Sequence, residues 1–227
     1  MPDVIISGPA GRLEGKYSPA KEEGAPVALI LHAHPRGGGH METPVNLMMY
    51  DLFKQRGFAV LRFNFRGVGR SQGVFDQGFG ELSDAATALD WAQAHNPNAP
   101  YCWVAGHSFG AFVGMQLLMR RPEIAGFISV APPTNMYDFT FLAPCPASGL
   151  IAHGDADSII SPEDMERVMS KVRVQKGIEI ERDIIPGAFH LFTNHVSELE
   201  SSVSRYLDRR LAQLNAPSLE SKDKKKR

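Results

Sequence analysis

Gly106-His107-Ser108-Phe109-Gly110 stands where an apolar run, residues 101–105, gives way to a helix-like segment at 111–121. A serine between two glycines at a strand-to-helix turn is typical of a nucleophile elbow, which holds the serine in strained backbone geometry. The glycines lie two positions either side of Ser108, where strand and helix must approach closely and a Cβ would intrude. The pattern predicts that the Ser108 hydroxyl stands above a sheet, at the positive end of the new helix.

Outward from this turn, strand-like runs alternate with helical segments, which predicts an α/β fold: a mostly parallel sheet with helices on both faces. Eight strands are expected, the first two as a hairpin, and several are continuous apolar runs, as a sheet covered on both faces requires. The expected strands are residues 4–7, 12–17, 27–32, 59–65, 101–105, 126–130, 149–153 and 178–185, and the expected helices are 45–56, 81–95, 111–121, 162–174 and 196–214.

The length and composition favour one core. With 227 residues and 43% hydrophobic content, residues 1–214 are predicted to form a single domain. The longest irregular connection in the second half, residues 131–146, is too short for a separate lid domain. Residues 222–227 are all charged and mostly basic, so residues 215–227 are predicted to be a solvated, flexible tail.

The charge pattern predicts neither a nucleic-acid partner nor a membrane partner, because the formal net charge is only -1 and charges of both signs are interspersed. The first residues lack the pattern of a secretory signal, and no apolar run approaches the length of a membrane span. Two isolated cysteines, Cys102 and Cys145, suggest neither a disulfide framework nor a cysteine-based zinc site. A cytoplasmic location is therefore expected.

A serine hydroxyl is a weak nucleophile and needs a base, which in turn needs an acid to orient it. In this architecture the chain order is serine, acid, histidine. His190 follows a strand within a loop that contains Pro186 and Gly187, and we assign it as the base. The alternative, His195, opens the last helix and is expected to be a surface or capping residue.

Two carboxylates follow the strand at 149–153. Asp155 sits in a tight turn, where aspartate commonly bonds its own backbone, whereas Asp157 lies further out. Asp157 is the preferred acid and Asp155 the alternative. Acyl transfer also needs two amide donors for an oxyanion, one just after the serine and one in the loop after the third strand. Phe109 is the first; His34 is preferred for the second, with Arg36 as the alternative.

Taken together, these motifs resemble the α/β-hydrolase family over residues 27–206. The matching segments are residues 32–35, 64–71, 106–110, 153–157 and 187–190. More narrowly, the chain is similar to small lidless bacterial hydrolases of the dienelactone hydrolase and esterase kind. The resemblance implies an α/β-hydrolase fold, a triad of Ser108, Asp157 and His190, and no cofactor.

The expected activity is that of a serine hydrolase working through an acyl-enzyme, foremost a carboxylesterase on small or medium esters. A thioesterase or a small-peptide or amide hydrolase would use the same triad. The substrate partner is thus a small molecule with an acyl group, and Tyr137, Phe139 and Phe141 are predicted to line one side of its site. A homodimer is the base-rate expectation for such an enzyme.

Three alternatives use other features of the sequence. His32 and His34 share a face at a strand end and, with His40 and an aspartate, could bind a divalent metal in a metal-dependent hydrolase. A catalytically silent scaffold used for binding is the second alternative. Third, Arg66 and Arg70 lie after the fourth strand, where they would either attract an anionic substrate or form ion pairs.

Overall fold

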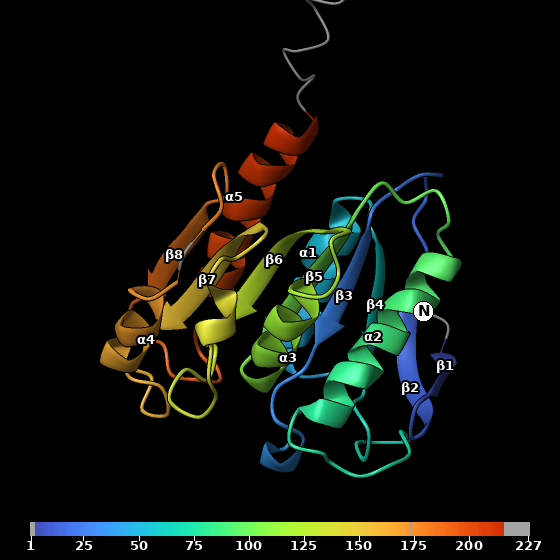
Figure 1. Ribbon diagram of the computed structural model, residues 1–227, viewed down its shortest axis with the longest axis horizontal. Helices are drawn as coiled ribbons and strands as arrows, with labels where there is room; N and C mark the ends of the chain where they lie inside the picture. Colours follow the sequence, from blue (N-terminus) through green and yellow to red (C-terminus); the bar gives the residue numbers. More distant parts are fainter. Residues whose placement is uncertain (1–2, 173, 216–227) are drawn as a thin grey trace, which may run out of the picture.

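A computed structural model describes residues 3–172 and 174–215 of the chain. Within these residues eight strands form one sheet, in the order β1-β2-β4-β3-β5-β6-β7-β8 (Figure 1). The first two strands form an antiparallel hairpin, β2 is antiparallel to β4, and all other neighbours are parallel. The predicted fold class is confirmed. The strands are β1 (Asp3–Gly8), β2 (Gly11–Ser18), β3 (Val27–Leu31), β4 (Ala59–Phe63), β5 (Cys102–His107), β6 (Ile124–Val130), β7 (Ser148–Gly154) and β8 (Ile180–Ile185).

Five α-helices cover the two faces of this sheet within the described residues. They are α1 (Pro44–Gln55), α2 (Phe79–Ala94), α3 (Phe109–Leu118), α4 (Pro162–Met169) and α5 (Val196–Asn215), with short 3-10 turns η1 (Pro35–Gly37) and η2 (Thr140–Leu142). In Figure 1, α2, α3 and α4 lie in front of the sheet, and α1 and α5 lie behind it. Alternate side chains of each buried strand enter the two cores, because successive residues of a strand point to opposite faces.

Several elements end earlier than the sequence predicts, and α4 differs most. The helix ends at Met169 rather than at residue 174, because Val174 forms a parallel bridge with Cys145 and so follows a strand-like path. β4 ends at Phe63 rather than at residue 65. The Asn64 amide still binds the Glu14 carbonyl of β2, but the Phe65 amide binds the His32 ring in place of a neighbouring strand's backbone. After Phe63 the chain thus leaves the sheet, at the edge where the candidate active site lies.

The parallel strands place their carboxyl ends along one edge of the sheet, and the loops that follow them meet there. All four non-glycine residues with positive φ in the described part of the chain lie in these loops: Gln77, Ser108, Ala131 and Phe192. Backbone strain of this kind gathers at functional sites. No helix among the described residues is long and apolar enough to span a membrane. The predicted basic tail lies outside the described residues from residue 216 onward.

Candidate active site

Ser108 occupies a strained turn between β5 and α3. Its backbone has φ 52° and ψ −116°, and its amide donates to the Val130 carbonyl at 2.8 Å. Both flanking glycines are required by close packing. A Cβ at Gly106 would lie 2.4 Å from the Gly110 carbonyl carbon, and one at Gly110 would lie 2.3 Å from the Leu31 carbonyl oxygen. The two glycines therefore let the strand and the helix meet while the serine turns outward.

The Ser108 side chain begins a continuous path of hydrogen bonds through His190 to Asp157. The His190 Nε2 atom lies 2.9 Å from Ser108 Oγ, and its Nδ1 atom lies 2.8 Å from Asp157 Oδ2. All three residues are buried: Ser108 is 7% exposed, His190 8% and Asp157 5%. With a carboxylate next to Nδ1, the neutral imidazole carries its proton there, which leaves Nε2 to accept the serine proton.

Asp157 is held as a carboxylate by hydrogen bonds on both oxygens. Its Oδ1 atom accepts the amides of Ile159 and Ile160 at 2.8 and 2.9 Å. Burial by itself would raise the pKa of Asp157, but the His190 hydrogen bond and the two amides outweigh burial and lower that pKa. The acid is thus ionised and fixed in orientation at neutral pH.

Asp155 has a different place. Its Oδ1 atom accepts the Gly187 amide at 2.6 Å, which ties the loop after β7 to the loop that carries His190. The Ala156 amide adds a second link to the Ala188 carbonyl, at 3.2 Å. Of the two candidate acids, Asp157 contacts His190 and Asp155 holds the loops together. The other candidate base, His195, accepts the Leu199 amide with its carbonyl at the start of α5.

His107 is a site residue that the sequence analysis did not single out. Its Nε2 atom donates to the His190 carbonyl at 2.9 Å, and the two rings lie 5.7 Å apart. Burial lowers the pKa of His107 to about 4, so the ring is neutral at physiological pH. The sequence indicated only that His107 precedes the elbow serine, because its contact with His190 joins residues 83 positions apart.

His34 and Phe109, the two residues whose amides are expected to bind an oxyanion, lie close together. The two rings are 5.2 Å apart. The Arg36 amide already donates to the His34 ring at 3.1 Å, which leaves Arg36 unsuited as the second donor. Within residues 3–172 and 174–215, the amides of His34 and Phe109 donate to no protein acceptor.

His32 is proposed above as a metal ligand, but both of its ring nitrogens already take part in hydrogen bonds inside the protein. Its Nδ1 atom donates to the Ala33 carbonyl at 2.6 Å, and its Nε2 atom accepts the Phe65 amide at 3.0 Å. Burial lowers its pKa to about 3. No group of three His, Cys, Asp or Glu side chains in the described part of the chain is placed to hold a metal ion. His32 is therefore not available as a metal ligand, which argues against the metal-dependent hydrolase.

The two arginines after β4 form ion pairs. Arg66 binds the buried Asp84 carboxylate through two nitrogens, at 2.9 and 2.7 Å, and Arg70 binds Glu14 at 2.8 Å. Arg66 is buried with its partner rather than on the surface. This geometry favours the ion-pair interpretation over attraction of an anionic substrate.

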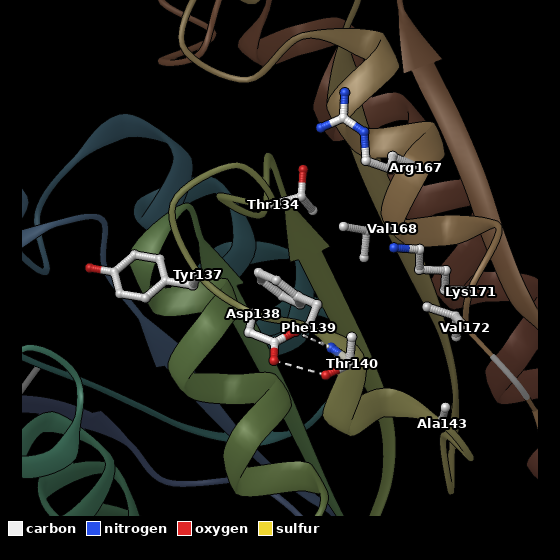
Figure 2. A pocket seen from close by; sticks show the side chains of 10 residues that line it. All are labelled: Thr134, Tyr137, Asp138, Phe139, Thr140, Ala143, Arg167, Val168, Lys171 and Val172. Atoms are coloured by element: carbon white, nitrogen blue, oxygen red, sulfur yellow. Dashed lines mark hydrogen bonds between the residues drawn. The ribbon is translucent and has the colours of Figure 1, made fainter.

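The three aromatic residues predicted to line the substrate site differ in their surroundings. Tyr137 stacks on Phe112 at 4.2 Å and lies 5.9 Å from the Phe109 ring, next to Ser108. Phe139 is 3% exposed and packs against Phe112 and Phe141, so packing dominates its role. Phe139 and Tyr137 also border a cavity of about 230 Å³ between the loop after β6 and α4. Figure 2 shows the Tyr137 phenol pointing away from Arg167 and Lys171 on the opposite wall.

Comparisons with known proteins fit this geometry. Residues 16–176 match the family model of X-Pro dipeptidyl-peptidases, the S15 family. An α/β hydrolase of unknown function from Agrobacterium tumefaciens shares 57% identity and a TM-score of 0.92, over 96% of this chain and all of that one. The chain belongs to the α/β-hydrolase family. Within the α/β hydrolases, this chain matches the family model of the S15 family.

Two further solved structures extend the likeness. A serine hydrolase homologue from Coxiella burnetii shares 33% identity, with a TM-score of 0.83, over 91% of this chain and 97% of that one. A lidless serine hydrolase from Xanthomonas campestris shares 29% identity, with a TM-score of 0.81, over 92% of this chain and 94% of that one. The S15 match ends at residue 176 and therefore does not include His190, whose ring contacts Ser108 in the structure.

Proposed function

We propose that this α/β hydrolase is a carboxylesterase that cleaves small or medium esters through a covalent acyl-enzyme on Ser108. The observation that carries the proposal is the hydrogen-bonded path from Ser108 through His190 to Asp157. An oriented base activates a serine hydroxyl, and a buried carboxylate stabilises the imidazolium that forms when the base takes the proton.

In the proposed reaction, Ser108 Oγ attacks the ester carbonyl while its proton moves to His190 Nε2. The amides of Phe109 and His34 stabilise the oxyanion of the tetrahedral intermediate. The intermediate collapses as the carbon–oxygen bond to the alcohol breaks, and His190 gives its proton to the leaving oxygen. Water then attacks the acyl-serine with the same proton relay, which releases the acid and restores Ser108.

Apolar side chains around the site support an apolar substrate. Phe189 and Leu191 flank His190 and are exposed, and Met136, beside Tyr137, is exposed as well. Phe79 is exposed at the start of α2, next to Gly78, where an added Cβ would meet the Phe112 and Phe109 rings. Exposed apolar groups that rim a site are typical of surfaces that bind apolar ligands.

Amide hydrolysis is the second candidate, because the matching family model is that of a peptidase. An enzyme that removes N-terminal dipeptides must bind a charged amine, which calls for a carboxylate. Glu81 lies near enough to act electrostatically on His34 and Tyr137, but it is fully buried and accepts the amides of Asp76 and Gly78. Because Glu81 already accepts two backbone amides, it is a poor partner for a substrate amine, which favours the ester.

A substrate panel separates these candidates. p-Nitrophenyl esters of increasing chain length, an acyl thioester and an X-Pro anilide are assayed with the wild type and with Ser108→Ala. Ser201→Ala, an exposed serine on α5, is the matched control. We expect esters to give the highest kcat/KM and Ser108→Ala alone to abolish it. A higher kcat/KM for the anilide than for every ester would contradict the proposal.

A further inference from the structure

A second cavity, which the proposed reaction does not use, lies between α4 and the edge strand β8. Its volume is about 320 Å³. The walls include Ile151 from β7, Met165 from α4 and Ile184 from β8. These three residues and Pro162 form the apolar part of the wall, which His153, Glu166, Arg182 and Asp183 complete. The cavity is larger than the cavity of about 150 Å³ that holds benzene in another protein.

One polar side chain in this apolar wall has no hydrogen bond. The His153 side chain is 5% exposed, and neither of its ring nitrogens has a hydrogen-bond partner in the described part of the chain. Burial lowers the pKa of His153 and outweighs the opposing effects of Asp157, of the Ile160 carbonyl and of Asp155. The Ile160 carbonyl acts on the ring without the geometry of a full hydrogen bond. The ring is therefore neutral, with one donor and one acceptor to satisfy. A buried polar group left unpaired is destabilising, which points to a ligand.

The charges around the cavity define the ligand further. Nδ1 of His153 lies 4.0 Å from Asp157 Oδ2, so an anionic group at the ring would be repelled by the carboxylate. Arg182 and Glu166, which also border the cavity, form an ion pair with each other. Asp183, the third charged residue at the cavity, accepts the Ser202 hydroxyl and pairs with Arg205 on α5. Each of these charged groups thus has a partner in the protein, and the apolar walls favour an uncharged ligand.

We propose that this cavity binds a small neutral alcohol or phenol, with the ligand hydroxyl on His153 Nε2 and its apolar body against Met165 and Ile184. A hydroxyl that donates to Nε2 fixes the ring proton on Nδ1, facing the Asp157 carboxylate. A ligand that only accepts hydrogen bonds would place the proton on Nε2 and turn the Nδ1 lone pair toward that carboxylate, which is unfavourable. The site thus prefers a donor, and it couples the ligand to Asp157.

Binding is tested by calorimetry and by the ring ¹⁵N resonances of His153, with phenol as the probe and anisole and toluene as matched controls. These readouts do not depend on Ser108 being a nucleophile. We expect saturable binding of phenol, about fivefold tighter than that of anisole, as one hydrogen bond provides. The ¹⁵N resonances of the bound state are expected to show protonated Nδ1 and unprotonated Nε2.

Two variants locate the site. Met165→Trp fills the cavity and is expected to abolish phenol binding, whereas His153→Phe is expected to reduce it to the level of toluene; thermal melting checks that both fold. Phenol binding that persists in a folded Met165→Trp would place the ligand elsewhere and overturn the proposal. Equal affinity for phenol and anisole in the wild type, or no saturable binding, would overturn it without any variant.

Discussion

At the residue scale, the two aspartates of the loop after β7 have separate tasks. Asp157 accepts a hydrogen bond from His190 Nδ1, and Asp155 accepts one from the Gly187 amide. Asp157→Asn is expected to lower kcat on the order of 10⁴-fold, because an asparagine stabilises the wrong histidine tautomer. Asp155→Asn keeps an acceptor for Gly187 and should lose far less. Steady-state ester kinetics on both variants check this, and equal losses would contradict the assignment of Asp157.

Two buried histidines make the free energy of unfolding depend on pH. The pKa values of His32 and His107 are lowered to about 3 and about 4 in the folded protein, against about 6.5 in an unfolded chain. Below pH 6.5 the unfolded state therefore binds more protons than the folded state. The free energy of unfolding is highest above that pH and decreases toward pH 4. Each histidine accounts for up to about 2 kcal/mol of loss by pH 5.

Urea unfolding at pH 7 and pH 5 measures this loss. His107→Gln keeps a donor for the His190 carbonyl but does not titrate, so its pH-dependent loss should be smaller than that of the wild type. An identical loss in the two proteins would show that His107 does not contribute.

At the scale of elements, the turn from β5 into α3 depends on backbone contact. Gly110→Ala would bring a Cβ within 2.3 Å of the Leu31 carbonyl, which cannot move without disturbing β3. We expect a loss of about 3 kcal/mol or failure to fold. Gly114→Ala, one turn further along α3, meets only side-chain atoms, of Val104 at 3.1 Å and of Leu31 at 3.4 Å, and gains helix propensity, so its cost should be near zero. Similar melting temperatures for the two variants would contradict this explanation.

Local signals explain which elements were predictable. The elbow and the buried strands carry strong patterns, so their type and order followed from the sequence. The end of α4 did not, because the helical pattern continues to residue 174 whereas Val174 bridges to Cys145 far away in the chain. Long-range pairing overrode local propensity at this position.

At the scale of the whole molecule, the parallel sheet places the carboxyl ends of β5, β7 and β8 at one edge. The loops that follow these strands bring Ser108, Asp157 and His190 together there. Residue types and chain order were enough to nominate these three. The His107 contact with the His190 backbone and the link from Asp155 to Gly187 could not be read from sequence, because each joins residues that are distant in the chain and leaves no local pattern.

The central claim is that this fold activates Ser108 as a nucleophile. Intact wild-type protein is treated with a tagged fluorophosphonate beside Ser108→Ala and the control Ser201→Ala, and the modified peptide is identified by mass spectrometry. We expect stoichiometric labelling at Ser108 in the wild type and in Ser201→Ala, and none in Ser108→Ala. A folded wild-type protein that stays unlabelled, or that is labelled at another residue, would contradict it.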